Sequence, residues 1–239
     1  MELTTARPRL LAISHGTGSV AGRTAVGALV AAVRARHGDV RGGFVDVLQP
    51  DVATVLARLE LDRRGVIVPL LLSAGYHVHV DLRRAVRDRK DAVRIARALG
   101  PDAALVEVLR ARLEQAGLEG GDRVVLAAAG SSDARAVDDC RVVGEALAAR
   151  LGREVTVGFL SAAEPRLPAA VGAARDGGGR VVVASYLLAP GYFQDRAAQA
   201  GAEVVTDPLL VAHETPAPGL VDLVLRRYAE AAARFDEAA

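Results

Sequence analysis

The stretch LLAISHG at residues 10–16 is an apolar run that ends in Ser-His-Gly, and it recurs as VVLAAAG at residues 124–130. Two more segments repeat at nearly the same distance: GFVDVLQP (43–50) as GFLSAAEP (158–165), and LLSAGYH (71–77) as LLAPGYF (187–193). The offsets of 114, 115 and 116 residues indicate that one unit has been duplicated within the chain.

Each copy alternates apolar runs with helical patterns, which is typical of βαβ units around a parallel sheet. We predict strands at 9–15, 42–48, 65–72, 93–98, 122–129, 154–161, 180–188 and 203–207. We predict helices at 20–36, 51–62, 79–90, 101–116, 133–151, 165–175, 192–200 and 217–236. The expected fold is α/β, with two similar doubly wound parallel-sheet lobes, 1–118 and 119–239, a hinge at 119–122 and a cleft between the lobes.

The composition limits the classes of function. Of the 239 residues 51% are hydrophobic and 25% are charged, which is typical of a soluble globular protein. A net charge of +1 and 3% aromatic residues argue against binding to nucleic acid or to an anionic membrane. The single cysteine, Cys140, excludes a disulfide framework, and residues 1–9 lack a signal-peptide core. We expect a cytoplasmic enzyme.

His15 and His77 each follow an apolar strand-like run of the first copy. The carboxyl ends of parallel strands line the ligand crevice of an open α/β sheet, so the two imidazoles can face one bound molecule. The second copy has Ala129 and Phe193 at these positions. A fold that accepts alanine and phenylalanine there does not need imidazole for stability, so the histidines indicate a functional site.

Other motifs have simpler explanations. Gly16 and Gly18, with Asp46 after the second strand, fit the dinucleotide pattern G-x-G-x-x-A, but the match is short and gives the adjacent His15 no role. His37 ends a helical pattern and His213 lies in a loop. His79 could chelate a metal with His77, but a helix begins directly afterwards, so we interpret His79 as a helix-entry residue.

Three motifs in order resemble the class II chelatase family, the sirohydrochlorin cobaltochelatases and ferrochelatases. They are His15-Gly16-Thr17, Phe44-Val45-Asp46 with Pro50, and the run from Pro69 to His77 followed by Asp81-Leu82. The resemblance covers both copies and implies that a tetrapyrrole lies between two α/β lobes, where a divalent metal is inserted without nucleotide hydrolysis. The family's Phe-x-Glu motif appears here with the shorter carboxylate of Asp46.

By this resemblance His15 and His77 are the catalytic and metal-handling pair, supported by Asp46. Imidazole suits both tasks, because it titrates near pH 6.5 and ligates first-row divalent metals. Arg83 and Arg84, within a basic cluster, are predicted to hold the substrate's carboxylates, and Arg135 or Arg166 could assist from the other lobe. Tyr76, Tyr192 and Phe193 are predicted to contact the macrocycle.

The metal, Fe²⁺, Co²⁺ or Ni²⁺, is expected as a substrate, with sirohydrochlorin as its acceptor and no tightly bound cofactor. The sequence leaves open the metal, the siroheme or cobalamin pathway, and a monomer or homodimer. Two other functions remain: a non-catalytic metal or tetrapyrrole carrier and, third, an NAD-dependent oxidoreductase that uses Gly16 and Gly18.

Overall fold

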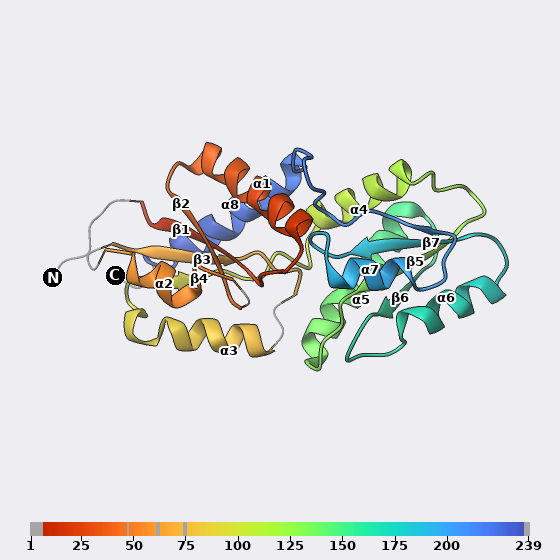
Figure 1. Ribbon diagram of the computed structural model, residues 1–239, viewed down its shortest axis with the longest axis horizontal. Helices are drawn as coiled ribbons and strands as arrows, with labels where there is room; N and C mark the ends of the chain where they lie inside the picture. Colours follow the sequence, from red (N-terminus) through yellow and green to blue (C-terminus); the bar gives the residue numbers. More distant parts are fainter. Residues whose placement is uncertain (1–6, 47, 61–62, 74–75, 237–239) are drawn as a thin grey trace.

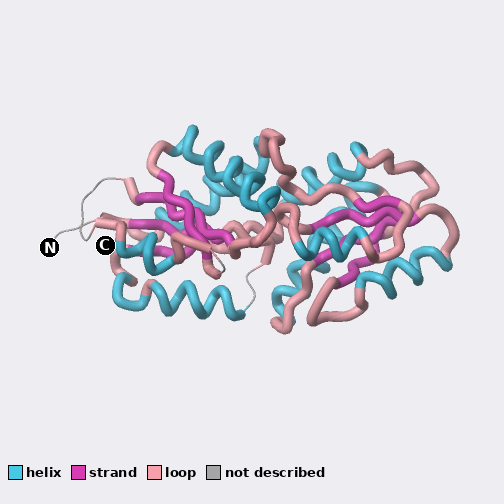
Figure 2. The backbone as a smooth tube through the Cα atoms, viewed as in Figure 1, coloured by secondary structure: helices cyan, strands magenta, loops and turns pink. Residues whose placement is uncertain are grey.

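The computed structural model describes residues 7–46, 48–60, 63–73 and 76–236, and only the backbone of residues 76–80. Two lobes lie side by side along the long axis of the molecule (Figure 1). Each lobe has a four-stranded parallel sheet at its centre with helices on both faces (Figure 2). The strand orders are β2-β1-β3-β4 and β6-β5-β7-β8, so the two sheets have the same topology.

The strands are β1 Arg9–Ser14, β2 Val40–Phe44, β3 Gly65–Pro69, β4 Val93–Ile95, β5 Arg123–Ala128, β6 Val155–Phe159, β7 Val181–Tyr186 and β8 Val204–Val205. The helices are α1 Val20–His37, α2 Val52–Ala57, α3 Tyr76–Ala85, the 3₁₀ turn η1 Arg87–Arg89, α4 Ala103–Gln115, α5 Ala134–Leu151, α6 Leu167–Asp176, α7 Tyr192–Ala198 and α8 Pro218–Ala233. The predicted fold class is confirmed.

Several predicted bounds were wrong. The strand predicted at 42–48 is β2, Val40–Phe44, the helix predicted at 51–62 ends at Ala57, and the strand predicted at 93–98 ends at Ile95. The difference that matters most for the site lies around His77. The strand predicted at 65–72 ends at Pro69, and the helix predicted at 79–90 begins at Tyr76 and ends at Ala85. Beyond Pro69, Leu70 still donates its amide to the carbonyl of Ile13 at 2.7 Å, but the chain then leaves the sheet. His77 therefore lies in the first turn of α3 and not at a strand end.

The central strands consist of apolar residues because both faces of each sheet are covered. All residues of β1, β3 and β7 are buried, and β5 is exposed only at Arg123. Continuous burial of this kind is the expected pattern for parallel strands between two layers of helices.

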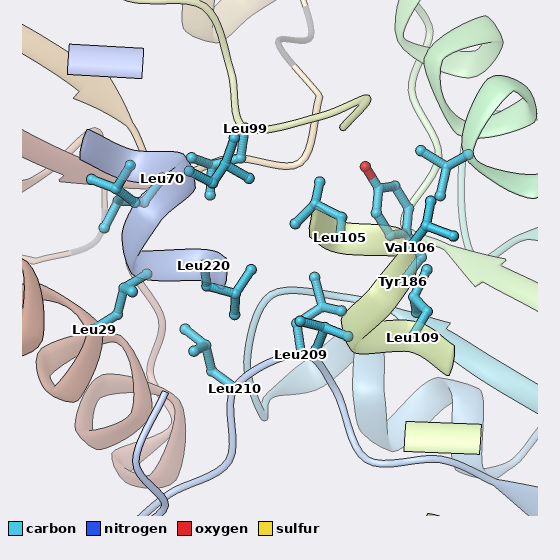
Figure 3. Packing of buried hydrophobic residues seen from close by; sticks show 14 of the residues in the cluster. Leu29, Leu70, Leu99, Leu105, Val106, Leu109, Tyr186, Leu209, Leu210 and Leu220 are labelled. Carbon is cyan, nitrogen blue, oxygen red and sulfur yellow. The ribbon is translucent and has the colours of Figure 1, made fainter. Parts of the chain in front are cut away.

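The last helix of each copy packs on the other lobe. Helix α4, which ends the first copy, contacts α5 and β7, and helix α8, which ends the second, contacts α1 and β3. Figure 1 shows α8 beside α1 in the first lobe and α4 in the second lobe. A single apolar cluster therefore runs through both lobes, and Leu70, Leu105, Tyr186 and Leu220 belong to it (Figure 3).

Two arginines, 115 residues apart, hold these exchanged helices, α8 and α4, on the lobe of the other copy. Arg227 of α8, 1% exposed, donates to the carbonyls of Ala98 and Leu99 at 3.0 and 2.9 Å and pairs with Asp102 at 2.9 Å. Arg112 of α4 donates to the carbonyl of Pro208 at 3.1 Å and pairs with Glu214 at 2.9 Å.

The equivalent interactions show that each copy holds the other in the same way. Because α4 and α8 each pack on the lobe of the other copy, a lobe of the structure does not coincide with one repeat of the sequence. The boundary at residues 118 and 119 stays a prediction.

Candidate functional site

His15 and Asp46 are brought together at the carboxyl edge of the first sheet. Strand β1 ends at Ser14, and its pairing with the chain after β2 continues for two residues. Val45 donates its amide to the carbonyl of Ser14 at 2.8 Å, and Asp46 donates its amide to the carbonyl of His15 at 3.1 Å. Both side chains are exposed. These main-chain hydrogen bonds bring the two residues together, whereas their roles stay predictions.

Gly16 turns the chain away from the sheet directly after His15. Its φ of +97° is in the left-handed region, which glycine adopts without a steric penalty. The Ser19 hydroxyl then caps α1 by accepting a hydrogen bond from the amide of Gly22 at 3.1 Å. This tight turn holds His15 at the edge of the sheet while the chain enters α1.

The same helix start does not favour a dinucleotide. A Cβ at Gly22 would lie 2.3 Å from the carbonyl oxygen of Pro190, so the second lobe packs against the first turn of α1. A Cβ at Gly18 would meet nothing within 4 Å, so close packing does not explain this glycine. A phosphate would need open access to the first-turn amides. The structure therefore gives the oxidoreductase hypothesis no support.

His77 belongs to the same edge only by its backbone position. Helix α3 begins at Tyr76, six residues beyond Leu70, which pairs with the end of β1. The side chains of Tyr76, His77 and His79 lie outside the described part of the structure. Helix positions two residues apart do not share a face, which agrees with separate roles for His77 and His79. The predicted pairing of His15 with His77 stays a prediction.

Arg83 and Arg84 form part of the last turn of α3. Both are exposed, and the described residues offer neither of them a hydrogen bond or an ion pair. Their guanidinium groups are therefore available to an anionic ligand, although their contact with substrate stays a prediction. Arg135 pairs with Asp133 at 3.0 Å and Arg166 with Glu164 at 3.1 Å, so both arginines across the junction already have partners.

The second lobe places an aromatic pair next to the His15 turn. A Cβ at Gly191 would lie 3.2 Å from the hydroxyl of Thr17, so the start of α7 adjoins the loop that follows His15. Tyr192 and Phe193, the next two residues, are 67% and 36% exposed, and their rings lie edge to face at 5.5 Å. Two exposed aromatic rings at the junction provide an apolar surface for a flat ligand.

The equivalent edge of the second lobe has the same backbone but lacks these side chains. Ser161 donates its amide to the carbonyl of Ala129 at 2.9 Å, as Asp46 does to His15, and Gly130 has a φ of +88°. The Ser161 hydroxyl also donates to the Ala129 carbonyl at 2.8 Å. The second edge thus has neither an imidazole nor a carboxylate at these positions.

A cavity of about 310 Å³ opens beside α3, at the ends of β3 and β4. Its lining is mostly apolar and includes two charged groups, Arg97 of the first lobe and Asp139 of α5. Burial, together with the neighbouring Asp138, raises the pKa of Asp139 above its usual value. Neither residue could be singled out from the sequence, because neither belongs to a motif or has a distinctive spacing.

Cys140, next to Asp139, is not a metal-binding thiolate. Burial raises the pKa of its thiol to about 12, so the sulfur keeps its proton at neutral pH. Within the described residues no three His, Cys, Asp or Glu side chains gather as a metal cluster.

None of the helices in the described ranges combines the length and the apolar character that a bilayer crossing requires.

A model of the CbiX family matches residues 9–116 and, a second time, residues 123–231. The chain belongs to the CbiX family. The double match agrees with the duplication seen in both the sequence and the two sheets. A comparison with curated proteins gave no match.

Solved structures show the same fold as this CbiX-family chain. SirB from Bacillus subtilis with Fe³⁺ is 22% identical, with a TM-score of 0.77 over 97% of this chain and 98% of that one. SirB from Bacillus subtilis subspecies spizizenii, a sirohydrochlorin chelatase in complex with cobalt, is 18% identical, with a TM-score of 0.73 over 96% and 97%. CbiX, described as the terminal enzyme for biosynthesis of siroheme in denitrifying bacteria, is 22% identical, with a TM-score of 0.67 over 93% and 99%.

Proposed function

We propose that this protein is a sirohydrochlorin chelatase, a lyase that inserts a divalent metal ion into a tetrapyrrole without ATP. The observation that carries the proposal is the carboxyl edge of the first sheet. There His15 and Asp46 lie side by side, next to the exposed Tyr192 and Phe193 of the second lobe. Membership of the CbiX family and the shared fold of SirB support it.

The chemistry requires a site that both holds a metal and takes up protons. Two pyrrole N–H groups each lose a proton as the nitrogens bind a divalent ion, so the macrocycle keeps its charge. The neutral imidazole of His15 has one free lone pair, which can either ligate the metal or accept a proton. The two tasks must therefore follow one another: His15 first holds the metal and, after its transfer, accepts one proton.

The second proton needs a second base, and we assign it to His77 at the start of α3. The Asp46 carboxylate next to His15 offsets the charge of the bound metal and orients the imidazole. Tyr192 and Phe193 form a wall for the flat face of the macrocycle. Arg83 and Arg84, which have no partner among the described residues, bind peripheral carboxylates.

The test is turnover of sirohydrochlorin under anaerobic conditions with Fe²⁺, Co²⁺ or Ni²⁺ supplied singly, and with no nucleotide. A chelatase produces many equivalents of metallated product per chain. A carrier gives at most one equivalent, and that result would overturn the proposal. We also propose that the reaction takes place in the cytoplasm, with neither nucleic acid nor membrane as a partner, and that the protein is a monomer or homodimer.

A further inference from the structure

The cavity beside α3 is shared by the two lobes. Pro69 is the last residue of β3, and Leu71 lies two residues beyond it. Leu82 comes from α3, and Asp139 comes from α5 of the second lobe. Figure 1 shows α3 and α5 on the same side of the molecule, one on each side of the junction. The cavity therefore adjoins the helix that carries His77, at the carboxyl edge of the sheet that carries His15.

The chain beside the cavity is held by one contact within the first lobe and one between the lobes. Leu99 donates its amide to the carbonyl of Leu71 at 2.8 Å, and the buried Tyr186 donates its hydroxyl to the carbonyl of Leu72 at 3.1 Å. A Cβ at Gly100 would lie 2.3 Å from each of these two oxygens, the Tyr186 hydroxyl and the Leu72 carbonyl. Such close packing restricts the chain at Gly100, one of the residues that line the cavity.

The corresponding strand ends of the second lobe are bridged by polar side chains. Ser185, the counterpart of Pro69, donates its hydroxyl to the carbonyl of Thr206 at 2.9 Å, and Gln194 donates its amide group to the same carbonyl at 2.9 Å. The first lobe has Pro69 and Ala96 at the positions of Ser185 and Thr206, and neither can form such a bridge. The open cavity thus belongs to the lobe with the histidines.

The two charged groups of the cavity differ in their freedom to bind. Arg97 is 69% exposed in its side chain, and within the described residues it forms one ion pair, with Glu230 at 4.0 Å; it also stabilises the charge of Asp139 at longer range. Asp139 is half-buried and has no ion-pair partner among the described residues. An anionic group entering the cavity is attracted by Arg97 and repelled by the carboxylate of Asp139.

We propose that the cavity binds one edge of the tetrapyrrole, with a pyrrole ring against the apolar lining and a peripheral carboxylate on Arg97. Asp139 opposes that carboxylate and limits the strength of binding, so substrate and product can exchange. This inference rests on the proposed function. A volume of about 310 Å³ suits a pyrrole ring and its side chains, whereas the whole macrocycle extends out of the cavity toward α3.

The experiment measures equilibrium binding of metal-free sirohydrochlorin by its absorbance, together with steady-state kinetics of metal insertion. Arg97→Gln is expected to raise the dissociation constant and KM about tenfold with little change in kcat, the size of one charge-assisted hydrogen bond. Arg97→Lys is expected to be intermediate, because lysine keeps the charge but loses the fork of donors. Asp139→Asn is expected to tighten binding two- to fivefold, an effect on the order of a weak charge pair.

Opposite signs for the two variants identify the ligand as an anion, since a purely structural role for either residue would weaken binding in both cases. Methyl esters of the substrate supply a second test. The ester removes the carboxylate charge, so Arg97→Gln and wild type are expected to bind it equally. Matched controls are Arg58→Gln, at the exposed end of α2, and Glu145→Gln, exposed on α5, which are expected to behave like wild type.

The outcomes separate the two proposals. If wild type neither binds nor metallates the tetrapyrrole, the proposed function is wrong. If wild type does both but the folded Arg97→Gln protein keeps the wild-type KM, or Asp139→Asn weakens binding, the inference about the cavity is wrong and the proposed function stands.

Discussion

The two lobes have the same backbone at their carboxyl edges and different side chains. In each lobe an amide from the chain after the second strand donates to the carbonyl that follows the first strand: Asp46 to His15, and Ser161 to Ala129. The hydrogen bonds that build the edge come from the main chain, so they tolerate the loss of imidazole and carboxylate. The fold of this edge therefore depends on main-chain atoms, whereas the chemistry that we propose depends on side chains that the second lobe lacks.

The exchange of helices has the opposite character, because both lobes retain it. Arg112 and Arg227 occupy equivalent places and bind equivalent carbonyls of the other copy. Two surface pairs are also equivalent: Glu107 of α4 binds Arg150 at 2.6 Å, and Asp222 of α8 binds Arg36 at 2.5 Å. The contacts that keep the lobes together are therefore present in both copies, whereas the side chains proposed to react, His15 and Asp46, are present in one.

The largest expected effect concerns the two arginines that hold the exchanged helices. Arg227→Met is expected to lower the free energy of unfolding by about 2–5 kcal/mol, because it leaves the buried carbonyls of Ala98 and Leu99 without a donor, whereas Asp102 keeps Arg226 at 2.6 Å. Arg112→Met is expected to cost only about 1–3 kcal/mol, since Glu214 is half exposed and can be hydrated. Urea denaturation of both variants gives the comparison. Equal losses of unfolding free energy would show that the difference in burial between Arg227 and Arg112 does not affect their contributions to stability.

A second comparison exchanges side chains between the two edges. His15→Ala is expected to reduce kcat at least about 10²-fold, the usual cost of losing a general base. Ala129→His is expected to leave turnover unchanged, because Ser161 provides no carboxylate beside it and bonds to the Ala129 carbonyl. Both variants need circular dichroism to establish folding. Near-normal turnover of a folded His15→Ala protein would refute the assignment.

A third prediction concerns the wall that the second lobe provides. Phe193→Ala is expected to raise KM roughly fivefold with a smaller change in kcat, the pattern of lost uniform binding. Phe193 is 36% exposed, so its truncation leaves no closed void in the free protein. The test compares kcat and KM of Phe193→Ala with those of His15→Ala, measured by steady-state kinetics. A fall in kcat with KM unchanged would mean that the second lobe takes part in the chemical step.

The smallest effect tests a histidine outside the site. Burial, and secondarily Arg7, lowers the pKa of His37, which packs edge to face on Tyr228 of α8 with ring centroids 4.4 Å apart. The unfolded chain therefore binds a proton near pH 6.5 before the folded protein does. Stability should fall as pH drops below about 6.5 and level off below the folded pKa.

The midpoint of urea denaturation, measured between pH 8 and pH 5, checks this prediction. His37→Leu removes the group and should flatten this part of the profile. An unchanged slope in the His37→Leu protein would assign the pH dependence to another group.

Much of this fold could be predicted from the sequence, because the repeat gives two sequences for each strand and helix. Each strand and helix has to be compatible with two different sequences, so chance patterns are filtered out. The proximity of His15 and Asp46 was also predictable, because parallel strands end at one edge. The position of His77 was not: apolar residues continue beyond Pro69, and hydrophobicity alone does not show that the chain leaves the sheet there.

The helix exchange and the cavity could not be predicted for a related reason. The apolar faces of α4 and α8 show that each helix is buried, but the pattern does not record which lobe buries it. Arg97 and Asp139 meet at one cavity only because of that arrangement in space. The hydrophobic pattern of a helix does not show which of the two copies it packs against, so contacts between the copies cannot be predicted from it.

The exchanged helices also bear on how such a chain could arise. A protein made of one repeat alone would expose the sheet face that the other copy's last helix now covers, and its own last helix would lack a sheet to pack on. Two such molecules could satisfy each other by trading helices, which describes a swapped dimer. Gene fusion would then convert an obligate pair into one polypeptide. The fused halves would then be free to diverge, because under the proposed function one edge with its histidine would be enough.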